Sequence, residues 1–444
     1  MEEEIEVLRQ IDWIEYGQTV LHPFAVLLVA IMAIVLLNSR STFFLIPFLV
    51  IAAFITHMQR FVIFSLDFSM LRILMVTGIL RVSLRNDTHK FEWEKMDSLI
   101  IAYIIVLSIA YVALRQNSSA IINRLGVGFE TLLAFFLIRM YLNSIIQIRY
   151  FIKALSYVFI LVAIFMTIEH LTHHNLFSVF GGVNSVTRIR EGRLRAQGAF
   201  SHSIMAGTFG AAFMPLFWGL KAIGNRKEKQ LAVAGIISSF VITWASSSSG
   251  PIITLMASSF AIIVWKGRRF LRYLILGSVY MIIILHIVMK APVWHLISRI
   301  DIVGGSTGYH RYFLIDQTIN RFSEWALLGV KTTGHWGWGL NDVTNMFIGQ
   351  AVKGGVMTLI LFLLIVHNGF LSVKRAIEEV PIDDKVQKLF WSWGAVLFAH
   401  CVSFFGVSYF GQMYFFWTLT LGILASLPVI AKNNDITIGN ENTL

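Results

Sequence analysis

The sequence predicts an all-α protein that crosses a membrane many times. Of its 444 residues, 56% are hydrophobic and only 14% are charged, whereas soluble globular domains carry about 25% charged residues. The apolar residues gather in long runs, and no run alternates apolar and polar positions as the strands of a membrane β-barrel do. Apolar runs of this length are typical of transmembrane helices.

The apolar runs define the candidate spans. A helix needs about 20 residues to cross a bilayer, and several runs are shorter, so we predict 12 or 13 transmembrane helices rather than a single number. Pro47 interrupts the second run and is expected to break it. The approximate runs are 19–37, 42–57, 66–83, 97–114, 127–143, 151–168, 201–219, 231–245, 251–265, 273–289, 355–370, 389–406 and 411–430.

Polar segments divide the chain around these runs. Residues 1–17 are acidic and amphipathic, which favours a short surface helix, and they lack the basic start of a cleaved signal peptide. The membrane domain extends over 18–430, and a polar tail over 431–444 follows. Two polar excursions interrupt the membrane domain: a basic one at 170–200 and a long one at 290–354, between the tenth and eleventh runs.

Basic residues in the loops predict the orientation. Clusters at 221–229, 266–272 and 374–388 fall on one side if each intervening run crosses once. Lysine and arginine concentrate on the cytoplasmic side of membrane proteins, so we place these clusters and the C-terminus there. Both excursions, 170–200 and 290–354, then lie on the extracytoplasmic side. These loops also explain most of the net charge of +11, and we predict no nucleic-acid partner.

The first excursion carries four arginines on the side where the charge rule disfavours them. Guanidinium groups bind phosphate in a bidentate, always-charged way, so we predict a clamp for a lipid-linked diphosphate. Attraction to anionic lipid headgroups is the alternative. His202 follows at the predicted start of the next helix, where it could bind a ligand or handle a proton. The four arginines are Arg188, Arg190, Arg193 and Arg195.

The second excursion contains three motifs of polar and aromatic residues, at 309–311, 335–338 and 341–345. Exposed aromatic rings with glycines could stack on sugars, but such rings also favour the membrane interface, and both interpretations stay open. Asp342 and His335 are candidate general bases, because both side-chain types can accept a proton from a hydroxyl group.

Within the first of these motifs, Arg311 has two interpretations. It could contact a phosphate, or it could pair with Asp316 and Glu324 along an amphipathic helix. We predict that the neighbouring His310 contributes to substrate binding.

Ionisable residues within or near the spans suggest a competing function. Charges in a bilayer are expensive and usually face a partner or a cavity, so Asp67, Arg72, Glu130 and Arg139 could serve a glycolipid or ion transporter or flippase. Such transporters commonly show internal repeats and paired broken helices, and neither is apparent. No metal-binding motif of the HExxH or CxxC type occurs, and we predict no metal or other cofactor.

An ordered set of motifs carries a family resemblance. RLRAQGAFSHSIMAGTFG precedes one apolar run, SSSSG lies between two others, and the long loop contains YHRYFLIDQTINRFSEWALLGV and DVTNMFIGQAVKGGVMTL. Together, over residues 60–425, they resemble the O-antigen ligase and Wzy-type polysaccharide polymerase superfamily. The resemblance implies a metal-independent glycosyltransferase of GT-C-like, all-helical architecture in the bacterial inner (plasma) membrane.

The resemblance also implies substrates and partners. The donor would be a glycan on undecaprenyl diphosphate, and the acceptor would be another such glycan or a glycolipid. The product would be a cell-envelope polysaccharide, with other polysaccharide-assembly membrane proteins and membrane lipids as partners. Arg195, with Arg193, matches the arginine before the family's Gly-x-Phe motif, and Arg311 matches the arginine of its loop helix.

Two positions depart from the family pattern. Thr344-Asn345 occupies the place of a His-Asn pair, so the usual base is replaced by threonine, and Asp342 or His335 would have to serve while Asn345 is retained. Residues 246–249 lack the arginine that often follows serine in this turn. These departures favour a divergent exopolysaccharide polymerase over a ligase, and leave a catalytically inactive scaffold as a further possibility.

Overall fold

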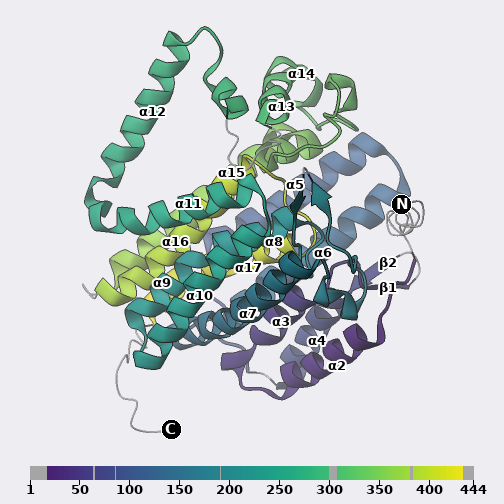
Figure 1. Cartoon of the computed structure of the whole chain (residues 1–444), viewed down its shortest axis with the longest axis vertical. Helices are drawn as coiled ribbons and strands as arrows, with labels where there is room; N and C mark the ends of the chain where they lie inside the picture. Colours follow the sequence, from purple (N-terminus) through teal and green to yellow (C-terminus); the bar gives the residue numbers. More distant parts are fainter. Residues whose placement is uncertain are drawn as a thin grey trace.

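The chain forms a bundle of helices with two small β-hairpins (Figure 1). The computed structural model describes residues 18–63, 66–85, 87–190, 192–299, 308–380 and 384–433, so the surface helix predicted over 1–17 lies outside the described residues. The helices are α2 (Pro23–Asn38), α3 (Ile46–Phe54), α4 (Met70–Arg85), α5 (Lys95–Arg115), α6 (Ser118–Tyr141), α7 (Ile145–Thr172), α8 (Ser203–Ala212), α9 (Met214–Ile223), α10 (Arg226–Ala245), α11 (Ser249–Val264), α12 (Leu271–Val288), α13 (Gly308–Asn320), α14 (Phe322–Trp325), α15 (Met346–Glu379), α16 (Asp384–Phe404) and α17 (Gln412–Lys432).

Shorter elements connect these helices. The 3₁₀ helices are η1 (Ser41–Phe43), η2 (Leu176–Phe180), η3 (Trp265–Phe270), η4 (Val293–Arg299) and η5 (Gly334–Trp336). The strands are β1 (Arg60–Ile63) with β2 (Leu66–Ser69), and β3 (Ile189–Arg190) with β4 (Arg193–Leu194). Each pair of strands is antiparallel.

The prediction of an all-α membrane protein is confirmed in its coarse form. Among the described residues, seven helical stretches are long and apolar enough to cross a membrane. The chain is therefore a multi-pass membrane protein. Each of the thirteen predicted apolar runs overlaps a helix of the bundle, but the number of 12 or 13 spans and the GT-C-like arrangement stay predictions.

Three runs differ in detail from the prediction. Pro47 does not break a helix but lies in the first turn of α3, where its missing N–H has no intrahelical partner to lose. Pro215 likewise begins α9, so the run 201–219 is divided into α8 and α9. The run 66–83 begins as a strand, because its first four residues pair with β1 before α4 starts.

The two ends of the bundle differ in character. Trp265 lies against Trp218 and Trp391, with ring centroids 6.2 and 5.5 Å apart. Each of these tryptophans lies within three residues of one predicted basic cluster. The three clusters therefore meet at one end, here called the basic end. At the other end, Ala196 N donates to Ala245 O. This second end carries the β3–β4 hairpin and the α13–α14 region, and we call it the hairpin end.

Helix α15 begins earlier than predicted and is broken inside the bundle. It starts at Met346, within the excursion predicted to extend to residue 354. Gly354 and Gly355 leave the helical conformation, and Gly355 has a φ of +75°. A Cβ at Gly355 would lie 2.3 Å from the carbonyl oxygen of Leu327. Only glycine therefore fits this break without strain.

The break in α15 holds the segment that follows α14. Val330 N donates to Val352 O at 2.8 Å, and Val356 N donates to Ala326 O at 2.8 Å. A broken helix leaves backbone groups that need partners inside a bilayer, and these two bonds supply them. The α13–α14 region is thereby fixed to the bundle.

Helix α12 stands apart from the rest of the bundle (Figure 1). None of its side chains is buried within the described part of the chain. It continues from η3 and leads into η4, which packs on α13: the rings of His295 and Tyr312 lie 4.7 Å apart, and Trp294 Nε1 donates to Asp316. Helix α12 is thus joined to the α13–α14 region but not to the core.

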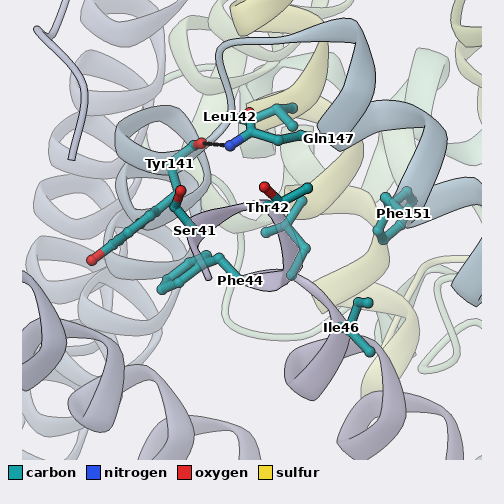
Figure 2. A pocket seen from close by; sticks show the side chains of 9 residues that line it. Ser41, Thr42, Phe44, Ile46, Tyr141, Leu142, Gln147 and Phe151 are labelled. Carbon is teal, nitrogen blue, oxygen red and sulfur yellow. Dashed lines mark hydrogen bonds between the residues drawn. The ribbon is translucent and has the colours of Figure 1, made fainter. Parts of the chain in front are cut away.

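A small cavity near the α6–α7 turn is structural (Figure 2). Its volume is about 10 Å³, which is close to the lower limit for one water molecule. Gln147 Nε2 donates to Tyr141 O at 2.8 Å, and Phe44 stacks on Tyr141 with centroids 3.7 Å apart. This cavity is too small for a sugar or a lipid headgroup.

The geometry of the α15 break predicts the effect of Gly355→Ala. The substitution places a Cβ on a residue with φ +75° and ψ −172°, a conformation essentially confined to glycine that costs other residues about 1–3 kcal/mol, and it adds the contact with Leu327. We expect a thermal unfolding midpoint in detergent that is lower by several degrees. Gly277→Ala is the control, because nothing lies within 4 Å of a Cβ there; equal midpoints for the two variants would contradict the prediction.

Candidate functional site: a cleft beside the arginine hairpin

The β3–β4 hairpin is anchored by a buried carboxylate. Glu169, near the end of α7, accepts hydrogen bonds from Gln197 N and Gly198 N, both at 2.9 Å, and from Thr187 Oγ1 at 3.3 Å. Its side chain is fully buried. Because these bonds join both ends of the arginine segment to α7, the hairpin has a fixed position over the bundle.

A cleft of about 590 Å³ opens between the hairpin and the ends of α7 and α10. Arg193 contributes an exposed guanidinium, and the rings of His170 and Trp244 lie 4.5 Å apart. Guanidinium groups suit phosphates, and a half-exposed tryptophan offers an apolar face with a polar edge. The cleft is lined by His170, His173, Ile189, Gly192, Arg193, Leu194, Trp244, Ser247 and Ile252.

The other arginines of the hairpin have different surroundings. Arg195 is partly buried, and its Nη2 donates to Ser248 Oγ at 2.7 Å, in the turn between α10 and α11. Arg195 N also donates to Arg188 O. Arg188 and Arg190 are exposed on the outer part of the hairpin. Of the four predicted phosphate ligands, Arg193 therefore lines the cleft, and Arg195 is fixed at the turn that borders it.

His202 caps helix α8 beside these arginines. Its Nδ1 accepts from Ile204 N at 3.1 Å, so in the neutral ring the proton lies on Nε2. Burial, with the charges of Arg195, Arg188 and Arg190, lowers the pKa of His202 to about 4. At neutral pH this side chain is a hydrogen-bond donor through Nε2, and its lone pair is already used.

A second group of predicted residues lies between α13 and the start of α15. His310 Nε2 is 3.0 Å from Gly339 O, and its Nδ1 is 3.3 Å from Thr344 Oγ1. Because a carbonyl only accepts, the neutral ring carries its proton on Nε2 and accepts from Thr344. Asn345 is buried and caps α15 by accepting from two backbone N–H groups.

The two predicted bases have different surroundings. His335 Nε2 lies 2.8 Å from Glu324, which also accepts from Trp336 Nε1 at 2.9 Å. The hydrogen bonds from His335 and Trp336, followed by that from Arg321, lower the pKa of Glu324 to about 2. Asp342 is exposed. His335 is thus held by an exposed hydrogen bond to Glu324 of α14.

Arg311 does not form the helical ion pairs that were considered from the sequence. Glu324 pairs instead with Arg321, and Asp316 accepts from Trp294 and Asn320. Arg311 lies against Gly406, where an added Cβ would be 3.7 Å from Cζ, and its Nε has no hydrogen-bond partner within the described ranges. Burial lowers the pKa of this guanidinium.

The segment between α16 and α17 lies between the two groups of residues. On one side, a Cβ at Gly411 would lie 2.8 Å from Ser201 Oγ, one residue before His202. On the other side, Ser408 Oγ donates to Val343 O at 2.7 Å, one residue before Thr344. Both groups therefore border the same segment at the hairpin end, although Arg311 contacts Gly406 rather than the hairpin arginines.

The charged residues near the spans are paired. Arg72 Nε lies 2.7 Å from Glu130, and Arg139 Nε lies 2.9 Å from Asp97, a partner that the sequence analysis did not consider. Asp67 lies 3.9 Å from Arg60. Across the described ranges, no three histidine, cysteine or acidic side chains gather where they could hold a metal ion.

Comparisons with known proteins do not identify a family. No protein-family model matches the sequence, and no curated protein does so significantly. The resemblance noted in the motifs therefore stays a prediction, and the chemistry of the cleft has to be argued from its own residues.

The environment of His202 predicts its titration. An ordinary histidine has a pKa near 6.5, and we expect His202 to remain neutral until the pH approaches 4. Exchange of the imidazole C2 proton in deuterated buffer, followed by peptide mass spectrometry, measures this midpoint. Arg195→Gln should raise the midpoint by removing a nearby positive charge. A midpoint near 6.5 in the native protein would contradict the assigned environment.

Proposed function

We propose that the protein is a glycosyltransferase that polymerises or ligates glycan from an undecaprenyl-diphosphate-linked donor. It would act on the extracytoplasmic face of the bacterial inner membrane, during cell-surface polysaccharide synthesis. The observation that carries this proposal is the cleft in which Arg193 lies beside Trp244 and His170. It combines a phosphate-binding group with an aromatic surface, and the motif resemblance supports the same substrate class.

The arginines stabilise the leaving group in this mechanism. The acceptor hydroxyl oxygen forms a bond to the anomeric carbon, and the bond from that carbon to the diphosphate oxygen breaks. The leaving lipid diphosphate takes the electron pair, so negative charge grows where Arg193 and Arg195 supply fixed positive charge. The attack comes from the opposite face of the sugar, and the configuration is therefore inverted.

His310 is the base that the geometry supports best. The acceptor hydroxyl must lose its proton, and the neutral Nδ1 of His310 faces the hydroxyl of Thr344. Thr344 Oγ1 would accept the proton of the acceptor hydroxyl and donate its own hydroxyl proton to Nδ1 of His310. Thr344 is then a proton relay, and His310 is the base. Arg311, next to His310 and without an ionic partner among the described residues, would hold a phosphate of the second substrate.

The competing transporter function receives less support. The charges that suggested it are held in the pairs Arg72–Glu130 and Arg139–Asp97. Each of these charges thus has a partner within the fold, and none needs a transported ion to compensate it.

The clamp is tested with Arg195→Ala in reconstituted protein supplied with a labelled lipid-diphosphate glycan. Loss of one electrostatic donor typically lowers turnover about 10²–10³-fold, and we expect that loss in new glycosidic bonds. Lys227→Ala, at the basic end, is the control and should keep native turnover. Native turnover in the Arg195 variant, with normal insertion, would refute the clamp. Translocation of the label without bond formation would favour a carrier.

The base is tested by comparing three variants in the same assay. His310→Ala should lose activity by about 10²–10⁴-fold, the usual contribution of general acid–base catalysis. His335→Ala should change turnover little, because its partner Glu324 lies on the protein surface. A large loss for Asp342→Asn combined with a small loss for His310→Ala would return the role to Asp342.

A further inference from the structure

A second group of cations lies at the hairpin end, on elements that do not form the cleft. The guanidinium carbons of Arg115 and Arg124 lie 4.5 and 4.2 Å from the ring centroid of Tyr111. Arg115 is at the end of α5, Arg124 is in α6, and Arg115 Nη2 donates to Lys331 O in the loop after α14. Two guanidinium groups therefore share one aromatic ring.

Arg115 also has an unused donor: its buried Nε has no hydrogen-bond partner within the described residues. We call Arg115 and Arg124, with Tyr111, the tyrosine cluster.

The tyrosine cluster has no acidic partner in the part of the chain that the structure describes. Neither of its two arginines forms an ion pair there, whereas the nearby Arg72 of α4, which approaches α6 at Gly126, is paired with Glu130. Like charges held side by side are unfavourable unless an anion compensates them. The favourable position of Arg115 at the C-terminus of α5 explains one of these arginines but not Arg124.

We propose that the tyrosine cluster is a second anion site, which binds the phosphate group of a lipid headgroup or a free phosphate. Arginine forks bind phosphate oxygens in pairs, and the stacking on Tyr111 holds both forks in place. This inference goes beyond the proposed glycosyl transfer, because binding here requires no reaction in the cleft beside the hairpin.

Binding is measured with the full chain in nanodiscs of phosphatidylcholine. One arm adds phosphatidic acid to the bilayer and counts bound lipid by native mass spectrometry; the other adds inorganic pyrophosphate and uses calorimetry. Binding of phosphatidic acid alone assigns the site to lipids, and binding of both assigns it to the phosphate group itself. Absence of binding in both arms would overturn the proposal.

Variants locate the site. Arg115→Gln combined with Arg124→Gln should weaken binding by about tenfold or more, since a hydrogen bond to a charged group contributes about 1.5–3 kcal/mol. Arg269→Gln combined with Arg272→Gln removes the same charge at the basic end and should leave the dissociation constant unchanged. Equal affinities for the native protein and the Arg115/Arg124 variant, or equal losses in the two variants, would refute the assignment.

A measurement on the native protein covers the case in which the variant does not fold. Phenylglyoxal modifies accessible arginines, and peptide mass spectrometry reports each position. Phosphatidic acid should slow modification of Arg115 and Arg124 several-fold and leave Arg269 unaffected. Unchanged modification of Arg115 and Arg124 would overturn the proposal independently of the variants.

Discussion

The hydrogen bonds across the break in α15 fix the position of the α13–α14 region on the bundle. A helix interrupted within a membrane leaves N–H and C=O groups that lose several kcal/mol each if they stay unpaired in an apolar environment. Here Val330 N donates to Val352 O, and Val356 N donates to Ala326 O, so these two groups at the break are paired. The α13–α14 region, which carries His310 and Arg311, is thereby attached to the helix that begins two residues after Thr344.

Glu169 fixes the position of the β3–β4 hairpin on the bundle. A buried carboxylate often suggests acid–base chemistry, but the oxygens of Glu169 accept hydrogen bonds from two backbone N–H groups and a threonine hydroxyl. These bonds fix both ends of the segment that carries the four arginines, and Arg188, Arg190 and Arg193 stay exposed on it.

The sequence was sufficient to predict the helical membrane class and the two polar excursions, because hydropathy depends on composition alone. It also predicted that arginines would gather at one end. It did not reveal His170, Trp244 or Ser248 as neighbours of these arginines, since they come from the end of α7 and the α10–α11 turn, which only the bundle brings together with the hairpin. The partner of Thr344 was missed for the same reason: His310 lies 34 positions earlier in the chain, and no local pattern indicates that contact.

The isolation of α12 makes the molecule sensitive to the thickness of its bilayer. Its 18 residues extend over about 27 Å, slightly less than an average hydrocarbon core of about 30 Å. No side chain of α12 is packed in the core of the protein, so the core does not fix its tilt. Since η4 follows α12 and packs on α13, we expect a change in acyl-chain length to displace α12 and the α13–α14 region together.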